Sequence, residues 1–169
     1  MNQSSTRQRM QDRRRSPKPE TKFVTKDIDH SGVVTSSQFV NSLPNGPENG
    51  ERIGRKTKTL FLEGFTTTSS GVDYRCVLYV SKSGTETLSL TNRYDPVDPE
   101  KFIVLKDWYL TNQEDGRTAF FKHKLPYGLN TEYDGISTSD IVNGQIVLYI
   151  HATASGNING YTRAWYLDN

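Results

Sequence analysis

Three histidines and one cysteine are the side chains of this sequence best suited to catalysis: His30, His123, His151 and Cys76. A nucleophilic or acid–base site needs such a group beside a base and a third, orienting group. None of the four stands in a glycine-rich phosphate loop, an HExxH or GxSxG pattern, or a Cys/His spacing typical of metal sites. Cys76 falls on an alternating apolar stretch, as a small core hydrophobe would. We therefore predict that the protein is not an enzyme and has neither catalytic nor metal-ligating residues.

The segment Asp27–Gly32, with sequence DIDHSG, has the acidic spacing that begins a calcium-binding EF-hand loop. The position that needs a bidentate glutamate holds Gln38, and neither flank has a helical pattern. We interpret residues 27–50 as an irregular or extended connector in which Asp and Ser form local turns. Its last part, Asn41–Gly50, is rich in Pro, Asn and Gly and is predicted to be a loop.

Positive charge is concentrated at the N-terminus. Residues 1–26 contain eight cations against Asp12 and Glu20, or 8 − 2 = +6, whereas the rest of the chain contains 13 cations and 17 carboxylates, or −4. A basic segment before a mildly acidic body is typical of a nucleic-acid-binding arm, and residues 1–26 are predicted to be disordered without a partner. A solubilising tail and a nuclear localisation signal are the alternatives. The candidate nucleic-acid-binding residues are Arg7, Arg9, Arg13, Arg14, Arg15, Lys18, Lys22 and Lys26.

The composition favours strands, with nine Tyr, seven Phe and thirteen Gly in 169 residues. No apolar run approaches the length of a transmembrane helix, and the N-terminus is too polar for a signal peptide. A single cysteine excludes an internal disulfide framework. We expect a soluble intracellular protein without a membrane partner.

The segment Lys101–Leu125 is predicted to be the central hairpin. Phe102–Leu110 is almost continuously apolar, which indicates a strand that is buried on both faces, either between layers or against another subunit. Gln113–Gly116 supplies the turn, because Asp-Gly tolerates positive φ.

About eight strands and no helix are expected in total, which predicts a β-sandwich or barrel.

Three short motifs follow the basic arm. The first opens a long strand with Arg52 and Gly54, the second is a strand with Lys101, Phe102, Leu105 and Asp107, and the third contains Leu125, Pro126, Leu129, Tyr133 and Gly135. In this arrangement the chain resembles the single jelly-roll capsid proteins of very small viruses, both satellite necrosis-type plant viruses and circular single-stranded DNA viruses. The resemblance implies an eight-stranded jelly-roll sandwich, with residues 1–26 as a disordered basic arm, 27–50 as a connector and 51–169 as the shell domain. Its strands would be Arg52–Thr67, Val72–Ser81, Thr85–Thr91, Phe102–Thr111, Arg117–Leu125, a short one near Thr131–Tyr133, Gln145–Ala154 and Tyr161–Leu167.

The resemblance also implies a function. The protein would be a structural component of the virion, assembling into a T=1 icosahedral shell of about 60 copies. Its arms would bind a packaged single-stranded genome, DNA or RNA, and assembly would take place in the host nucleus or cytoplasm. Plant satellite relatives often hold structural calcium between subunits, for which the oxygen ligands here would be Asp95, Asp98, Glu100 and Asp168. Contacts between copies are expected in the loops Asn41–Gly50, Asn92–Glu100 and Pro126–Ser139.

Two other binding functions remain alternatives. A carbohydrate-binding β-sandwich would use exposed aromatic rings, but it gives no reason for the arginine-rich arm. A monomeric nucleic-acid-binding β-protein explains the arm, but it does not explain why Phe102–Leu110 is apolar on both faces. The aromatic residues available to a carbohydrate site are Trp108, Trp165, Tyr127 and Tyr161.

Overall fold

The computed structural model describes residues 20–46, 48, 50–68, 71–84, 86–111, 117–138 and 140–168. Within these ranges the chain forms strands and no helix, which confirms the predicted all-β class. The strands are β1 (Thr21–Phe39), β2 (Lys56–Thr68), β3 (Tyr74–Ser81), β4 (Phe102–Leu110), β5 (Arg117–Tyr133), β6 (Ile141–Asn143) and β7 (Ile146–Asp168).

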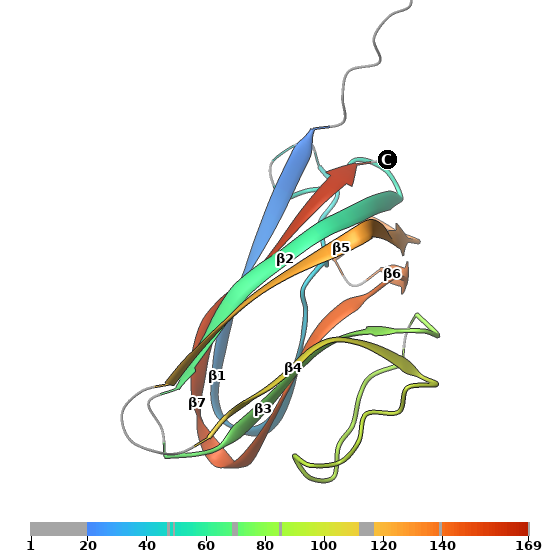
Figure 1. Cartoon of the computed structure of the whole chain (residues 1–169). Helices are drawn as coiled ribbons and strands as arrows, with labels where there is room; N and C mark the ends of the chain where they lie inside the picture. The colour runs from blue at the N-terminus through green and yellow to red at the C-terminus, as the bar shows by residue number, and fades with distance from the viewer. Residues whose placement is uncertain are drawn as a thin grey trace, which may run out of the picture.

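The strands form one antiparallel sheet in the order β4-β3-β7-β2-β5-β6, and β1 pairs with β7. The long strands β1 and β7 double back at the lower end of Figure 1. As a result the early part of β7 pairs with β3, whereas its late part pairs with β2. Gly32, with a φ of 71°, lies in the bend of β1, next to the register shifts of its ladder with β7.

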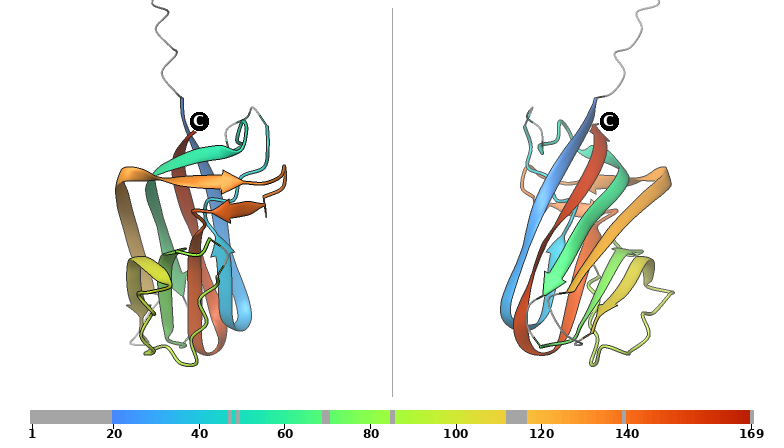
Figure 2. Two further views of the ribbon diagram at one scale, coloured as in Figure 1. Left: turned by 90° about the vertical axis from the view of Figure 1, so that its right-hand side faces the viewer. Right: turned by 60° about the vertical axis from the view of Figure 1, so that its left-hand side comes forward.

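Because of these bends the sheet folds over itself into two layers. The first layer consists of the early part of β1, the late part of β7, β2 and β5, which lie side by side in the right-hand view of Figure 2. The second consists of the late part of β1, the early part of β7, β3 and β4. β6 extends the end of β5 through the pairs Glu132↔Asn143 and Tyr133↔Ile141.

The main core lies between the two layers. Leu62 of β2, Leu78 of β3 and Leu148 of β7 are fully buried. Burying each such side chain contributes about 1.5–3 kcal/mol. Trp108 of β4 crosses this core, with its ring centroid 5.3 Å from that of Phe121 on β5. The small residue Gly64 permits this packing, since a Cβ there would lie 2.8 Å from the Phe121 ring.

The connection between β3 and β4 covers the outer face of the second layer. Leu88 and Leu90 pack with Tyr79 and Tyr149 in a second apolar cluster, so every residue of β3 is buried. The prediction of a strand at Thr85–Thr91 is wrong for residues 86–91, because the structure shows that these residues are irregular. Their backbone bonds to side chains and not to a neighbouring strand: Leu88 N donates to the Tyr79 hydroxyl at 2.9 Å, and Leu90 N to the Tyr149 hydroxyl at 3.3 Å.

The prediction for Lys101–Leu125 is wrong in two respects. β4 pairs with β3 and β5 pairs with β2, so the two strands belong to different layers and form no hairpin with each other. β4 is also an edge strand, on which Ile103, Val104 and Tyr109 are exposed. A continuous apolar run does not distinguish a strand covered on both faces from one whose outer face is left open. The predicted turn Gln113–Gly116 lies outside the described residues.

The boundaries of the predicted arm and connector also differ from the structure. Residues 1–19 lie outside the described residues, but Thr21–Phe39 is one strand, β1, which overlaps both predicted segments. Its inner face carries Val24 and Ile28, and it pairs with β7 along most of its length. The predicted strand Arg52–Thr67 begins instead at Lys56, and β5 continues to Tyr133 through a segment predicted to be mostly loop.

Candidate nucleic-acid interface

Six of the eight predicted nucleic-acid-binding cations lie outside the described residues, and the other two lie on β1. The buried Lys22 forms an ion pair with Asp168, with Nζ and Oδ2 2.9 Å apart, which ties the start of β1 to the end of β7. Lys26 is half-buried, and burial lowers its pKa. These two lysines are therefore parts of the folded body and not of a disordered arm, because alternation along β1 turns them toward its inner side.

Arg52, a further basic residue, has a structural role. Its side chain is 1% exposed, and its guanidinium donates hydrogen bonds to the carbonyl oxygens of Leu43, Gly54 and Gly135. The guanidinium carbon also lies 3.9 Å from the centroid of the Tyr133 ring. Arg52 thus joins the β1–β2 connection to the β5–β6 connection, and it is not available to bind phosphate.

The outer face of the first layer combines aromatic and charged side chains in three rows, which we call the aromatic–basic face. Residues opposite each other in an antiparallel ladder point to the same face, so the register defines the rows. The first row is Phe23, Trp165, Phe61 and Lys124; the second is Thr25, Arg163, Glu63 and Lys122; the third is Asp27, Tyr161, Phe65 and Phe120.

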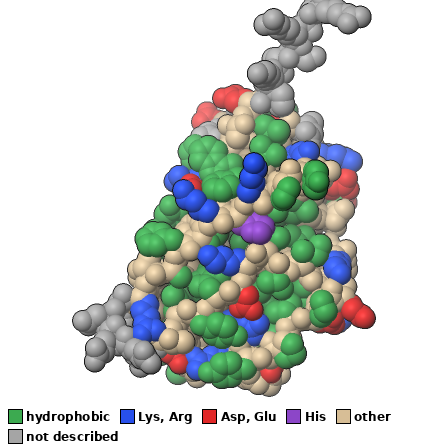
Figure 3. Space-filling view, in the orientation of Figure 1, with side chains coloured by type: hydrophobic (Ala, Val, Ile, Leu, Met, Phe, Trp, Pro, Cys, Tyr) green, Lys and Arg blue, Asp and Glu red, His purple; other side chains and the backbone are tan. Residues whose placement is uncertain are grey.

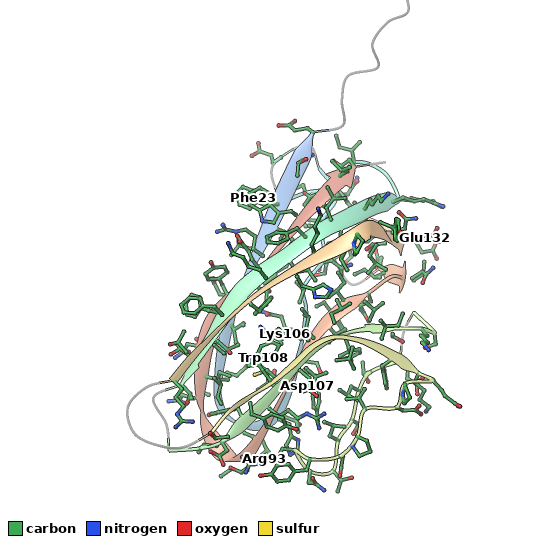
Figure 4. All side chains as sticks on the ribbon, in the orientation of Figure 1. Phe23, Arg93, Lys106, Asp107, Trp108 and Glu132 are labelled. Atoms are coloured by element: carbon green, nitrogen blue, oxygen red, sulfur yellow. The ribbon has the colours of Figure 1, made fainter. Side chains whose placement is uncertain are left out.

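The rings of this face contact one another across the strands. Phe65 of β2 lies between Tyr161 and Phe120, with centroid distances of 5.0 and 5.8 Å. In the first row the Phe23 and Trp165 centroids are 5.0 Å apart, and Figure 4 labels Phe23 at the β1 edge of the face. On β2 and β7 the rings of the first and third rows are four residues apart, and the charged side chains of Glu63 and Arg163 lie between them.

Arg163 lies at the centre of the face. Its guanidinium carbon is 5.1 Å from the Phe23 centroid and 5.4 Å from the Tyr161 centroid, within the range of cation–π attraction. The same side chain donates to the Thr25 hydroxyl at 3.0 Å and lies 3.4 Å from Glu63. Its position is therefore fixed by four neighbours.

The β5 side of the face is open to solvent. Phe120 is 74% exposed, and Lys122 and Lys124 follow it at two-residue intervals. Within the part of the chain that the structure describes, neither lysine forms an ion pair. Figure 3 shows hydrophobic and basic side chains interspersed over the region that β2 and β5 occupy in Figure 1. Exposed rings beside unpaired cations can stack on bases and bind phosphates.

The histidines and the cysteine do not gather at one site. His30 has the Ser36 hydroxyl 3.0 Å from its ring on the bend of β1, whereas His151 is buried beside Tyr149 in the second layer. Cys76 is fully buried, and burial raises the pKa of its thiol. His123 lies on β5 between Lys122 and Lys124.

The carboxylates that the resemblance linked to calcium have other roles. Asp95 accepts hydrogen bonds from the backbone N–H groups of Thr91 and Asn92, each at 2.8 Å, and Asp98 accepts one from Glu100 N at 2.9 Å. Asp168 pairs with Lys22. Among the described residues, no three His, Cys, Asp or Glu side chains form a group that could hold a metal ion. No helix long and apolar enough to span a membrane occurs in those same ranges.

Comparison with known proteins gave no relatives: no family model matches the sequence, and no curated protein matches it. The function must therefore be argued from the residues and their arrangement.

The aromatic–basic face was not predicted from the sequence, although a signal for it exists. Three segments carry aromatic and charged residues at a period of two: Phe61-x-Glu63-x-Phe65, Phe120-x-Lys122-x-Lys124 and Tyr161-x-Arg163-x-Trp165. Each pattern alone is typical of a half-exposed strand. Only the pairing of β7 with β2 and of β2 with β5 brings the three patterns together.

Proposed function

We propose that this protein is a viral capsid protein with a jelly-roll fold that self-assembles into a small icosahedral shell of about 60 copies. Its Arg/Lys-rich N-terminal arm packages a single-stranded genome. The two layers support this proposal, because among the described residues they contain eight strand segments, four in each, when β1 and β7 are counted as two segments each and the three-residue β6 beside β5 is left out. Two packed four-stranded layers are the architecture of the jelly rolls found in viral capsids.

The observation that carries the proposal is the position of the exposed apolar side chains. On the edge strand β4, Ile103, Val104 and Tyr109 are 48%, 41% and 43% exposed. On the far side of the sheet, Tyr127 of β5 is 90% exposed and Ile136 of the β5–β6 connection is 78% exposed. Apolar edges are an aggregation hazard unless another chain covers them. Copies of the same chain would cover them in a closed shell.

Particle size tests the proposal directly. Light scattering and electron microscopy of the purified protein are expected to show closed particles of uniform diameter. Ile136→Asp places a charge in the expected contact and should prevent assembly while the subunit stays folded. Ser89→Asp, at an exposed polar position, is the matched control and should still assemble. A monodisperse monomer near 19.2 kDa at every salt concentration and pH would contradict the proposal.

The alternative is a β-sandwich module that binds nucleic acid or carbohydrate without forming a shell. The aromatic–basic face favours binding of some kind, but the four aromatic residues predicted for a carbohydrate site do not come together. Trp108 is 8% exposed in the core, and Tyr127 lies outside the three rows that contain Trp165 and Tyr161. The same size measurement separates a small module from a shell.

A further inference from the structure

We propose that the aromatic–basic face binds unpaired bases of single-stranded nucleic acid, with its rings stacking on the bases and Lys122 and Lys124 binding the phosphates. This site is distinct from the N-terminal arm. The inference rests on the proposed function only in taking the packaged genome as the natural ligand.

The ring arrangement is the first argument. Tyr161, Phe65 and Phe120 form one continuous row, because each ring contacts the next at 5.0 and 5.8 Å. Phe120 ends this row, 74% exposed, at the β5 side. Exposed aromatic side chains on a sheet are the usual platforms for unpaired bases, since every base has a π face. A base stacking on Phe120 would extend the row by one ring.

The charges beside the rings are the second argument. The rows contain three cations, Arg163, Lys122 and Lys124, against the carboxylates Asp27 and Glu63. Arg163 and Glu63 form an ion pair with each other, so their charges cancel. Asp27 lies at the far β1 edge, and the two lysines, which form no ion pair with any residue that the structure describes, lie beside the most exposed ring of the face. The negative partner that fits is therefore a phosphate at the β5 side of the face.

The path of the chain is the third argument. Residues 1–19, which carry Arg7, Arg9, Arg13, Arg14, Arg15 and Lys18, are joined through Glu20 to β1, the strand that bears Phe23. A strand of nucleic acid that crosses the face from β5 to β1 would therefore reach the strand to which this basic segment is joined. The segment itself cannot be the ligand of the face, because both are cationic.

A comparison of two oligomers of equal charge tests the base contacts. The probes are fluorescent (dT)12 and an abasic deoxyribose-phosphate oligomer of the same length, and the protein is full-length at a concentration too low for particles to form. Stacking predicts at least about tenfold tighter binding of (dT)12 than of the abasic oligomer. Binding through the charge of the basic arm alone would be equal for both oligomers.

Variants locate the contact on the face. Phe120→Leu should weaken (dT)12 binding about tenfold and leave abasic binding unchanged. Tyr127→Leu removes an even more exposed ring from the same strand outside the rows and is the matched control; it should change neither value. Lys122→Gln should weaken both oligomers alike and reduce the slope of log K against log salt by about 1.

Equal binding of the two oligomers by the wild-type protein, or an unchanged ratio in Phe120→Leu, would overturn the inference. If Phe120→Leu also lost its particles while the ratio stayed unchanged, the face would be a contact between copies. Binding of a neutral oligosaccharide at the face without preference for (dT)12 would overturn it in favour of a carbohydrate site. Particle formation by the wild-type protein, measured separately, tests the proposed function, so the two failures are distinguishable.

Discussion

The indole Nε1 of Trp108 donates a hydrogen bond to the hydroxyl of Thr66 at 3.0 Å, and this bond joins the two layers through the middle of the core. Trp108 comes from β4 and Thr66 from β2, and both are buried. Lys106 also reaches across from β4 and donates to the carbonyl of Phe120 on β5 at 3.1 Å. Figure 4 shows Lys106 and Trp108 near each other beside β4. Where β4 faces β2 and β5, the two layers are therefore held together by side chains and not by backbone hydrogen bonds between strands.

Truncating Trp108 should destabilise the subunit strongly. Trp108→Ala is expected to cost about 3–5 kcal/mol, because it opens a cavity between the layers. Trp108→Phe keeps a ring but removes the hydrogen bond to the Thr66 hydroxyl, which still has Cys76 as a partner, so the expected cost is only about 0.5–1.5 kcal/mol. Urea denaturation of the purified subunit measures both. Val104→Ala, on the same strand but 41% exposed, is the control and should cost much less. Equal stability of the wild type and Trp108→Ala would show that β4 is misplaced.

Replacing Arg52 should weaken the link between the β1–β2 connection and the β5–β6 connection and so destabilise the subunit. Arg52→Lys retains the charge but cannot present a planar fork to the carbonyls of Leu43, Gly54 and Gly135. The expected loss of unfolding free energy is about 2–4 kcal/mol, with some buried carbonyls left unsatisfied. Arg55→Lys, at an exposed position three residues later, is the matched control. An Arg52→Lys protein as stable as that control would contradict the structural role.

Many of the strands can be predicted from the local sequence pattern, but the pattern does not show which strands pair with each other. Cys76 falls on an alternating apolar stretch, and it lies in the core as predicted. β1 was missed because lysines and aspartates interrupt its alternation, and only its ladder with β7 shows it to be a strand. The change of partners within β7 leaves no local signal, because both of its halves are equally good strands.

Of the candidate nucleic-acid interface, only the positive charge of the N-terminal segment could be predicted from the sequence. The sequence identifies the basic arm by composition, but it cannot show that Lys22 is held by Asp168, a residue 146 positions later (168 − 22). It also cannot show that Phe65, Phe120 and Tyr161 lie in one row, since three strands distant in sequence must first be brought into register.

Acid should destabilise the subunit through His151. Burial lowers the pKa of His151 from its ordinary value of 6.5; Asp95 opposes this shift and Arg75 adds to it. The unfolded chain therefore binds a proton near pH 6.5 that the folded chain does not, so stability falls as the pH drops below about 7. His30, whose pKa is also lowered by burial, acts in the same direction.

The variant His151→Gln tests this assignment through the dependence of Tm on pH. Between about pH 7 and 5, the Tm of the variant should fall less steeply than that of the wild type, because one of the two groups that favour unfolding in acid is gone. Its Tm at about pH 7.5 serves as the internal reference for any packing defect. Identical slopes for the two proteins would exclude His151 as a source of acid sensitivity.

Deleting the arm should strongly reduce packaging and leave the subunit folded, provided that the cut spares β1. Removal of residues 2–19 takes away Arg7, Arg9, Arg13, Arg14, Arg15 and Lys18 but keeps the Lys22–Asp168 ion pair. A cut through Lys22 would break that pair and lower the Tm, which makes it the matched control for folding effects.

The loss of six cations should reduce the slope of log K against log salt by about 4, since each phosphate contact in a single strand releases roughly 0.7 of a counterion. Sequence preference should stay slight, because arginine and lysine side chains that bind phosphate do not read base edges. Oligomer binding at several salt concentrations measures the slope. The 260/280 nm absorbance ratio of purified particles, with and without residues 2–19, measures the packaged nucleic acid. Equal nucleic acid content in the two would make the arm a targeting tail. The genome contacts would then lie on the folded body, where the exposed Phe120, Lys122 and Lys124 are the first residues to replace.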